Sequence, residues 1–177
     1  KFARSTLNGL DVHDDPDGVL LSWLEREEKL FKTLEKHLIQ QRLAQGFDDV
    51  DAFLAYSLSV QNRRKSRVGL ALENHFEVVL REYGVQYDRT KVTENRSKPD
   101  FIFPGIQQYH DVTFPVDKLT MLGSKSTCKD RWRQVLAEAD RIDHKHLLTL
   151  EAAISTHQTD EMKDKKLQLV IPEAIHK

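Results

Sequence analysis

Residues 119–150 read LTMLGSKSTCKDRWRQVLAEADRIDHKHLLTL, and this segment has the clearest succession of secondary-structure signals in the chain. Apolar residues gather at its two ends, over LTMLGSK (residues 119–125) and HLLTL (residues 146–150), which predicts two strands. The residues between them, from about Cys128 to Arg141, have helical spacing, and Thr127 followed by Asp130 predicts a capping box at the helix start. A strand, a helix and a second strand in this order are typical of an α/β fold.

The flanking sequence extends this pattern in both directions. On the N-terminal side, residues 85–92 and FIF (residues 101–103) predict short strands, the second one stopped by Pro104 and Gly105. On the C-terminal side, a short helix up to about Lys166 and a strand LQLVI (residues 167–171) follow. We therefore predict an α/β sandwich with a central mixed sheet flanked by helices.

The first 85 or so residues predict helices only. Asp17 is predicted to cap a long helix that runs to about Ala44 and is ended by Gly46. A second helix is predicted over residues 50–60 and a third over residues 66–83, with a turn at NRRKSR (residues 62–67) between them. We predict a single domain over residues 1–177, made of a helical lead-in (residues 1–60) and a core (residues 61–177).

Composition narrows the class of protein. The 177 residues suit one globular domain, and no apolar run approaches the ~20 residues that cross a bilayer. The N-terminus lacks the apolar core of a secretory signal, and a single cysteine, Cys128, fits a reducing cytoplasm. We expect a cytoplasmic protein with no membrane partner. Because the chain starts without Met and ends directly after a predicted strand, we also expect a fragment of a longer protein.

Local charge points to phosphates although the net charge is only −1. Two basic clusters stand out, one of Arg63, Arg64, Lys65 and Arg67 and the other of Lys125, Lys129, Arg131 and Arg133. Clusters of this kind bind nucleic acid even where acidic residues elsewhere cancel the total charge. Two solvated charged faces explain the same pattern equally well at this point.

Three residues form a candidate hydrolytic centre. Asp100 follows Pro99 at the start of the FIF strand, Lys125 ends the next convincing strand, and Glu138 lies on the predicted helix after it. Phosphodiester hydrolysis needs a metal that neutralises developing charge and an oriented water, and Mg²⁺ prefers carboxylate oxygens. Arg131, seven positions before Glu138, is expected on the same helix face. The alternative reading is a turn residue, a solvated strand end and a surface helix residue.

The sequence also resembles a known family. NRRKSRVGLALENH, TENRSKPDFIFPG, MLGSKSTCKDRWRQVLAEADRI, KHLLTL and QLVIPEAIHK are similar to the catalytic domain of EcoRII-type (type II) restriction endonucleases, in the PD-(D/E)XK nuclease superfamily. The similarity covers roughly residue 61 to the C-terminus, and LSWLEREEKLF (residues 21–31) extends it. It implies a restriction-endonuclease-like fold in a prokaryotic cell and an Mg²⁺-dependent cut of duplex DNA at a CCWGG-like site.

The resemblance also implies how the site residues divide. Asp100 and Glu138 would hold the metal, and Lys125 would position the attacking water. The usual motif has an acidic residue two positions before the lysine, where this chain has Gly123, and the resemblance assigns the missing carboxylate to Glu138. The second-tier catalytic candidates are Glu73, Tyr109 and Lys129.

DNA recognition is expected from the same region. Lys129, Asp130 and Arg131 suit C·G pairs, because Arg and Lys donate to guanine and a carboxylate accepts from cytosine. The expected phosphate contacts are Arg63, Arg64, Lys65, Arg67 and Arg133. A pseudopalindromic site implies a homodimer with one centre per strand. Relatives extrude the central base pair, for which Trp23 and Arg26 are the pocket candidates.

Three other functions stay open on the sequence. A repair or junction nuclease of the same superfamily would share the centre and lack the base reader. A sequence-specific DNA-binding module would bind the site and not cut it. A structural α/β domain would show no salt-dependent affinity for DNA.

Overall fold

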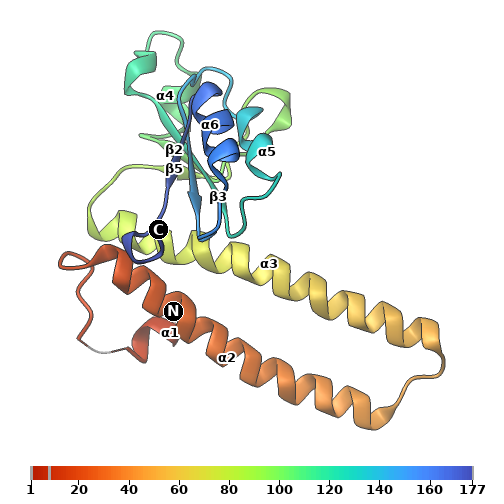
Figure 1. The fold of residues 1–177 in the computed structure, drawn as a ribbon. Helices are drawn as coiled ribbons and strands as arrows, with labels where there is room; N and C mark the ends of the chain where they lie inside the picture. Colours follow the sequence, from red (N-terminus) through yellow and green to blue (C-terminus); the bar gives the residue numbers. More distant parts are fainter. Residues whose placement is uncertain (1, 8, 177) are drawn as a thin grey trace. The chain divides into compact units, whose positions relative to one another are not determined.

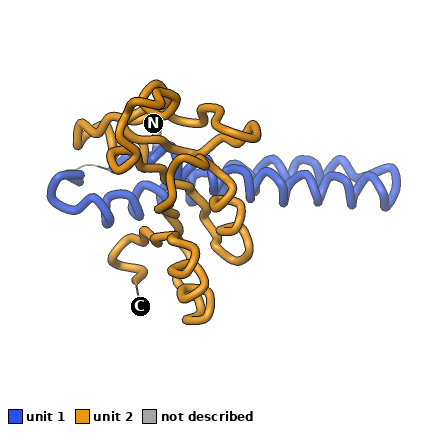
Figure 2. Tube along the Cα trace, turned by 90° about the horizontal axis from the view of Figure 1, so that it is seen from above, with its two compact units in different colours: residues 1–75 blue, residues 76–177 orange. Residues whose placement is uncertain are grey.

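The structure is a computed structural model that describes residues 2–7 and 9–176. The chain divides into two compact units, Lys1–His75 and Phe76–Lys177, shown in different colours in Figure 2. The sequence placed the division between lead-in and core near residue 60. One helix, α3 (Val50–Glu82), runs through residue 60 without a break and ends in the second unit, and the single domain with this boundary stays a prediction.

The first unit is helical. It holds α1 (Phe2–Ser5), α2 (Pro16–Gln45) and most of α3. Asp15, not Asp17, caps α2: its side chain accepts a hydrogen bond from the Gly18 amide at 2.8 Å, and Pro16 occupies the first helical position. Gly46 ends α2 with a φ of 76°, in the left-handed region that glycine adopts without steric cost.

The predicted turn at NRRKSR is wrong, because α3 is continuous across it. The segment contains no Gly or Pro, and Arg and Lys are good helix formers, so local propensity favours continuing the helix. The run of charge at this point marks an exposed stretch of helix, with residues 61–66 all exposed. The basic run at residues 62–67 therefore marks an exposed part of a helix and not a turn of the chain.

Long side chains join α2 to α3 inside the first unit, where the two helices run in opposite directions (Figure 1). Arg64 donates to Glu35 at 2.8 Å, and His75 Nε2 lies 2.7 Å from a Glu27 carboxylate oxygen. Arg67 stacks over Phe31, with its guanidinium 4.4 Å from the ring centroid. Glu35 and His75 are buried, so these pairs form part of the packing between the helices.

The second unit is built on a five-stranded sheet with the order β1-β2-β3-β4-β5. The strands are β1 (Asp88–Arg89), β2 (Phe101–Phe103), β3 (Thr120–Lys125), β4 (Lys145–Thr149) and β5 (Leu167–Val170). β1 to β3 pair antiparallel, and β3 to β5 pair parallel. The predicted mixed sheet is confirmed. Only the first strand is much shorter than the predicted residues 85–92.

Two short helices connect the parallel strands and cover one face of the sheet. They are α5 (Trp132–Leu136), between β3 and β4, and α6 (Thr156–Asp164), between β4 and β5 (Figure 1). Strand residues on this face join the helices in one buried cluster that includes Ile102, Met121, Leu147, Trp132, Val135 and Met162. On the other face, Phe101 meets Phe76 of α3 edge to face, with ring centroids 5.4 Å apart.

The helix predicted over residues 128–141 is the second clear correction. α5 has only five residues, its N-cap position is Arg131, and no side chain caps it, so the capping box at Thr127 is not formed. Lys129 and Ala139 have positive φ values of 30° and 52°, which interrupt a helix on both sides of α5. Glu138 therefore lies in the turn after α5, and the shared helix face predicted for Arg131 and Glu138 does not exist.

The remaining elements are short. They are α4 (Ile106–His110) and the 3₁₀ turns Glu94–Arg96, Val116–Lys118 and Glu173–Ile175. In the part of the chain that the structure describes, none of the helices has the length and apolar character needed to span a membrane.

Candidate active site

Asp100 and Lys125 meet at one end of the sheet. Asp100 Oδ2 accepts a hydrogen bond from Lys125 Nζ at 2.8 Å and a second one from the backbone amide of Ser124 at 2.6 Å. Both side chains are largely buried, with 16% of Asp100 and 11% of Lys125 exposed. A carboxylate that is fixed by two donors in a partly desolvated place is pre-oriented for a ligand on its other oxygen.

The sheet register explains this meeting. In the antiparallel pair, Phe101 lies opposite Leu122 and Ile102 lies opposite Met121, so Asp100 comes opposite Gly123. Because side chains alternate between the faces of a strand, Gly123 and Lys125 share a face, and Asp100 lies on it with them. Two residues that are 25 positions apart in the chain thus become neighbours through strand pairing alone.

Glu138 belongs to the same site electrostatically. Burial raises the pKa of its carboxyl group to about 7; the negative charge of Asp100 also raises it, and the positive charges of Lys125 and Lys145 oppose the shift. Its Oε2 atom is buried and has no hydrogen-bond partner among the described residues. A buried carboxylate oxygen that has no hydrogen-bond partner and lies near a second carboxylate is typical of a cation-binding site.

Gly123 stands two positions before Lys125, where the usual motif has an acidic residue, and the packing around it explains this difference. A Cβ atom built on Gly123 would lie 2.7 Å from Cγ2 of Val135, and that contact is shorter than real Cβ atoms tolerate. Val135 is fully buried in the core of the second unit, where it packs α5 onto the sheet. A side chain at this strand position would overpack Val135 and force α5 or the strand to shift, so the packing disfavours a carboxylate here.

Lys145 fixes the turn that carries Glu138, although it was not a predicted site residue. The side chain is only 6% exposed, and Nζ donates to the carbonyl oxygens of Leu136 at 3.0 Å, Ala139 at 3.4 Å and Glu138. These are carbonyls at and beyond the end of α5, which lack helical partners. Burial lowers the pKa of the lysine. A lysine directly before an apolar strand gave no signal of this role.

The donor set fits a hard divalent cation. Asp100 and Glu138 supply carboxylate oxygens, and the described residues contain no group of three or more His, Cys, Asp or Glu side chains that would form a closed cage. Mg²⁺ is commonly held by one or two carboxylates, with water and substrate phosphate in its other positions. The residues present therefore suit Mg²⁺ better than zinc, which prefers nitrogen and sulfur ligands.

Tyr109 lies apart from these three side chains in its contacts. It is fully buried on α4, and its hydroxyl donates to Glu94. Burial and the bond to Glu94 raise its pKa well above the usual range. Arg141 binds the carbonyl oxygen of Tyr109 and that of Asp111, the latter at 3.0 Å. These contacts hold Tyr109 in the core of the second unit, and its second-tier catalytic role stays a prediction.

The three predicted base readers lie together in the segment before α5. Lys129, Asp130 and Arg131 are all exposed, and Asp130 is 91% exposed in its side chain. Asp130 contacts Arg133 at 3.0 Å, and Arg133 also binds both oxygens of Glu161 at 2.8 and 2.9 Å. Arg133, predicted to contact phosphate, is thus held by two carboxylates, whereas Lys129 and Arg131 project from the surface.

The four basic residues of α3 that were predicted to contact phosphate have different surroundings in the structure. Arg64 is bound to Glu35, and Arg67 is 17% exposed against Phe31 and Glu27. Arg63 and Lys65 are exposed, and Arg63 donates to the Ser59 hydroxyl at 3.2 Å. Glu73 belongs to the same helix and is half-buried in the first unit.

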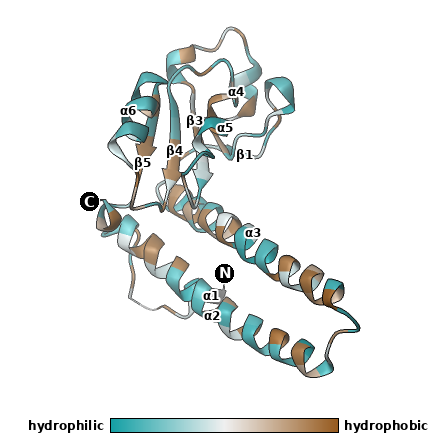
Figure 3. Cartoon of the chain, turned by 45° about the vertical axis from the view of Figure 1, so that its right-hand side comes forward, coloured by the Kyte–Doolittle hydropathy of each residue, from teal (hydrophilic) through white to brown (hydrophobic). Residues whose placement is uncertain are grey.

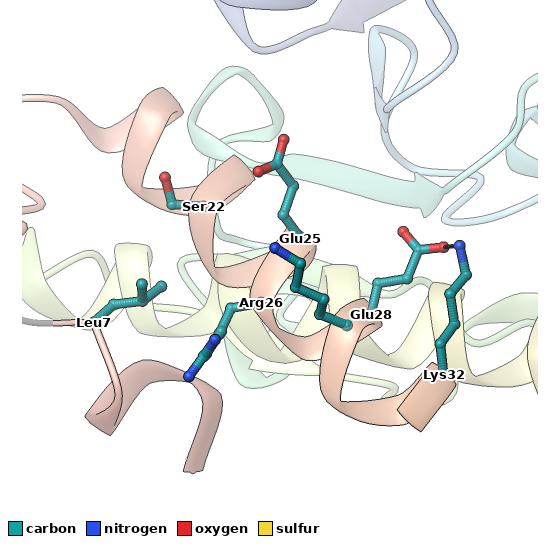
Figure 4. Close-up of a pocket in the computed structure, with 7 residues that line it drawn as sticks. Leu7, Ser22, Glu25, Arg26, Glu28 and Lys32 are labelled. Carbon is teal, nitrogen blue, oxygen red and sulfur yellow. Dashed lines mark ion pairs between the residues drawn. The ribbon is translucent and has the colours of Figure 1, made fainter. Parts of the chain in front are cut away.

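The two residues predicted for a base pocket have different environments. Trp23 is only 6% exposed and packs against His75, with ring centroids 5.7 Å apart, as a core residue does. Arg26 donates to the Thr6 hydroxyl at 3.0 Å and lines an open pocket of about 470 Å³. Figure 4 shows that pocket, in which Glu28 and Lys32 form an ion pair.

The chain is similar in sequence to one known family and to one of its enzymes. The model of the family described as EcoRII C terminal matches residues 31–177 of this chain. The type II restriction enzyme EcoRII of Escherichia coli is 45% identical over 164 residues, which are 92% of this chain and 41% of that enzyme. The chain therefore spans less than half the length of this relative.

Solved structures show the same fold at lower identity. The restriction endonuclease PspGI in complex with substrate DNA matches with a TM-score of 0.74 and 19% identity, over 96% of this chain and 69% of that one. Metal-depleted Ecl18kI in complex with uncleaved DNA matches with a TM-score of 0.75 and 20% identity, over 91% and 61%. The predicted restriction-endonuclease-like fold is confirmed by these matches.

Proposed function

Because this chain belongs to the EcoRII C-terminal domain family, we propose that it is a nuclease domain that hydrolyses duplex DNA at a short pseudopalindromic site. The observation that carries the proposal is the meeting of Asp100 and Lys125, hydrogen-bonded at 2.8 Å, with the unpartnered carboxylate oxygen of Glu138 coupled to both. Two carboxylates and a lysine are the groups that metal-assisted phosphodiester hydrolysis needs.

Each residue has a distinct task in this proposal. Asp100 and Glu138 would hold Mg²⁺, which when bound neutralises charge on the scissile phosphate and acidifies a water molecule. Lys125, which donates to Asp100, would orient that water and offset negative charge as it develops. Lys145 keeps the turn around Glu138 in position through three backbone carbonyls and is a positioning residue.

Recognition is assigned to the exposed segment before α5. Lys129 and Arg131 would donate to guanine edges in the major groove, and Asp130 would accept from a cytosine amino group. A CCWGG-like sequence fits such a reader of neighbouring C·G pairs. Arg63 and Lys65 are the exposed cations of the α3 cluster that would contact phosphate, because Arg64 and Arg67 are engaged within the unit.

Cutting both strands of a pseudopalindrome requires two centres, so the proposed partner besides DNA is a second copy of the chain. EcoRII is an enzyme of Escherichia coli, and a bacterial cytoplasm is the proposed location. Arg26 and its pocket remain the proposed place for an extruded base. Trp23 is buried against His75 and contributes packing.

The experiment uses short duplexes with and without a CCWGG sequence, with Asp100→Ala and Glu138→Gln as variants. We expect Mg²⁺-dependent cutting of the CCWGG duplex by the unmodified protein. The two variants should bind that duplex with affinity close to the parent and cut it at least 100-fold more slowly. Cutting by either variant at the parental rate would refute the metal site.

The same experiment separates the alternative functions. Site-specific binding without cleavage at any divalent metal concentration would identify a DNA-binding module. Cleavage of branched or damaged duplexes without sequence preference would identify a repair or junction nuclease. Absence of salt-dependent binding would leave a structural α/β domain, because phosphate contacts make affinity fall steeply as salt rises.

A further inference from the structure

One face of α3 combines exposed leucines with opposite charges at its two ends. Asp51, Leu54, Leu58, Gln61 and Lys65 are spaced by three and four residues, so they share one side of the helix. All five are exposed, and Leu54 and Leu58 have 55% and 58% of their surface open to solvent. Figure 3 shows hydrophobic turns at this end of α3. We call these five residues the outer face of α3.

The outer face is separate from the contacts inside the first unit. α3 meets α2 through other positions: Val60 is buried, Arg64 pairs with Glu35, and Arg67 stacks on Phe31. In the part of the chain that the structure describes, neither Asp51 nor Lys65 forms an ion pair. The outer face is thus an amphipathic helix side whose apolar centre and terminal charges are unused.

The order of charges on this face is self-complementary. Asp51 and Lys65 lie at equal distances of seven residues on either side of Leu58. If two copies of α3 pack antiparallel about a two-fold axis at Leu58, Asp51 of each copy faces Lys65 of the other, and the two Leu58 side chains meet on the axis. Parallel packing would instead place like charges together, which is unfavourable.

We propose that the outer face of α3 is a docking surface for the outer face of a second copy of this chain, packed antiparallel about Leu58. The choice of a second copy over another protein rests on the charge pattern and, in part, on the proposed function, which needs two centres. The face is short, since residues 51–65 of a helix span roughly 20 Å. A contact of this size calls for a test that traps it covalently.

The test is disulfide trapping of Leu58→Cys, because only a residue on the two-fold axis meets its own copy. Leu34→Cys on α2 is the matched control, with 59% of Leu34 exposed against 58% of Leu58. The native Cys128 is buried, and the unmodified protein measures its background. We expect a disulfide-linked dimer under mild oxidation for Leu58→Cys, at least ten-fold more than for Leu34→Cys. Equal yields for the two variants would overturn the proposal.

Charge variants in the Leu58→Cys background test the pairing itself. Asp51→Lys alone and Lys65→Asp alone should each lower the dimer yield at least five-fold, and the two together should restore it. Failure of the double variant to recover would overturn the antiparallel register. The unmodified protein and the same charge variants without Leu58→Cys, followed by sedimentation, give a readout free of cysteine chemistry.

The trapping is done without DNA or divalent metal, so it is independent of cleavage. A failed trap with normal cutting of CCWGG duplexes would refute only the docking surface. A normal trap without cutting would refute only the proposed function. If Lys65→Asp weakens binding to DNA while Asp51→Lys changes neither DNA binding nor trapping, Lys65 is a phosphate contact and the docking proposal falls.

Discussion

Replacing Glu138 by Gln should make the metal-free protein more stable at alkaline pH. The folded protein holds the Glu138 carboxyl with a pKa of about 7 against an ordinary value of 4.5, mainly because of burial and then because of Asp100. A raised pKa means that the folded state binds the proton more tightly than the unfolded state. The contribution of Glu138 to stability is therefore most favourable below pH 4.5 and is lost as the pH rises through about 7.

The size of this change in unfolding free energy follows from the difference between the two pKa values of Glu138. At 1.36 kcal/mol for each pKa unit, the step from the ordinary to the raised value corresponds to roughly 3 kcal/mol at most. Because Glu138 is only partly buried, screening by water reduces the expected effect to about 1–2 kcal/mol. Gln has almost the same shape and no charge to bury, so it removes this penalty.

The assay is urea unfolding of the parent and of Glu138→Gln at pH 5 and pH 8.5 with a metal chelator present. The variant should gain about 1–2 kcal/mol on the parent between the two pH values. Glu82→Gln, at an exposed carboxylate at the end of α3, is the control and should show no such gain. A constant difference between Glu138→Gln and the parent at both pH values would refute the buried, charge-coupled carboxylate on which the metal site depends.

Three further predictions concern the surroundings of the centre. Gly123→Ala should lower the free energy of unfolding by about 1–3 kcal/mol, because the new methyl group overpacks against Val135. When Val135→Ala is present in the same chain, Gly123→Ala should lower the free energy of unfolding by less, and additive losses in this double-mutant cycle would contradict the clash. Tyr109→Phe should lower stability by about 1–2 kcal/mol through the lost bond to Glu94 and leave the cleavage rate within a few-fold, and loss of all cleavage with normal folding would contradict the structural role. Arg131→Ala should reduce preference for the cognate duplex by about 1–3 kcal/mol, measured by competition binding, and equal loss on random DNA would make Arg131 a phosphate contact.

The strands near the site were predictable because their signals are local and mutually consistent. FIF is an apolar run bounded by Pro99 and Pro104, and the structure has β2 at the same residues. LTMLGSK ends in a small and a charged residue, and β3 ends at the same Lys125. Short apolar runs with turn residues on both sides leave few other local structures open.

The helices were harder to predict because charge and spacing are ambiguous in them. The basic run at residues 62–67 continues α3 although it looks like a loop, since long charged side chains favour both exposure and helix. The opposite error occurred at residues 128–141, where helical spacing suggested one helix and tertiary packing leaves five residues of it. The positive φ of Lys129 and of Ala139 depends on contacts that the sequence does not display.

The three residues of the site were candidates from the sequence, but their roles were assigned only with help from the family resemblance. Strand pairing brings Asp100 to Lys125, and pairing registers are not visible in a single sequence. The reason for a glycine at position 123 is visible only in the structure, where Val135 fills the space that an acidic side chain would need. Lys145 gave no sequence signal, because its partners are backbone carbonyls of the turn around Glu138.

Cleavage of methylation-free plasmid DNA with Mg²⁺ by the parent and by Lys125→Ala, side by side and with the fragment ends sequenced, tests the hydrolytic centre itself. A hydrolytic centre of Asp100, Lys125 and Glu138 predicts discrete fragments from the parent, ending at CCWGG-like sites, and intact plasmid with the variant. Discrete fragments of the same kind and at the same rate from Lys125→Ala would contradict it.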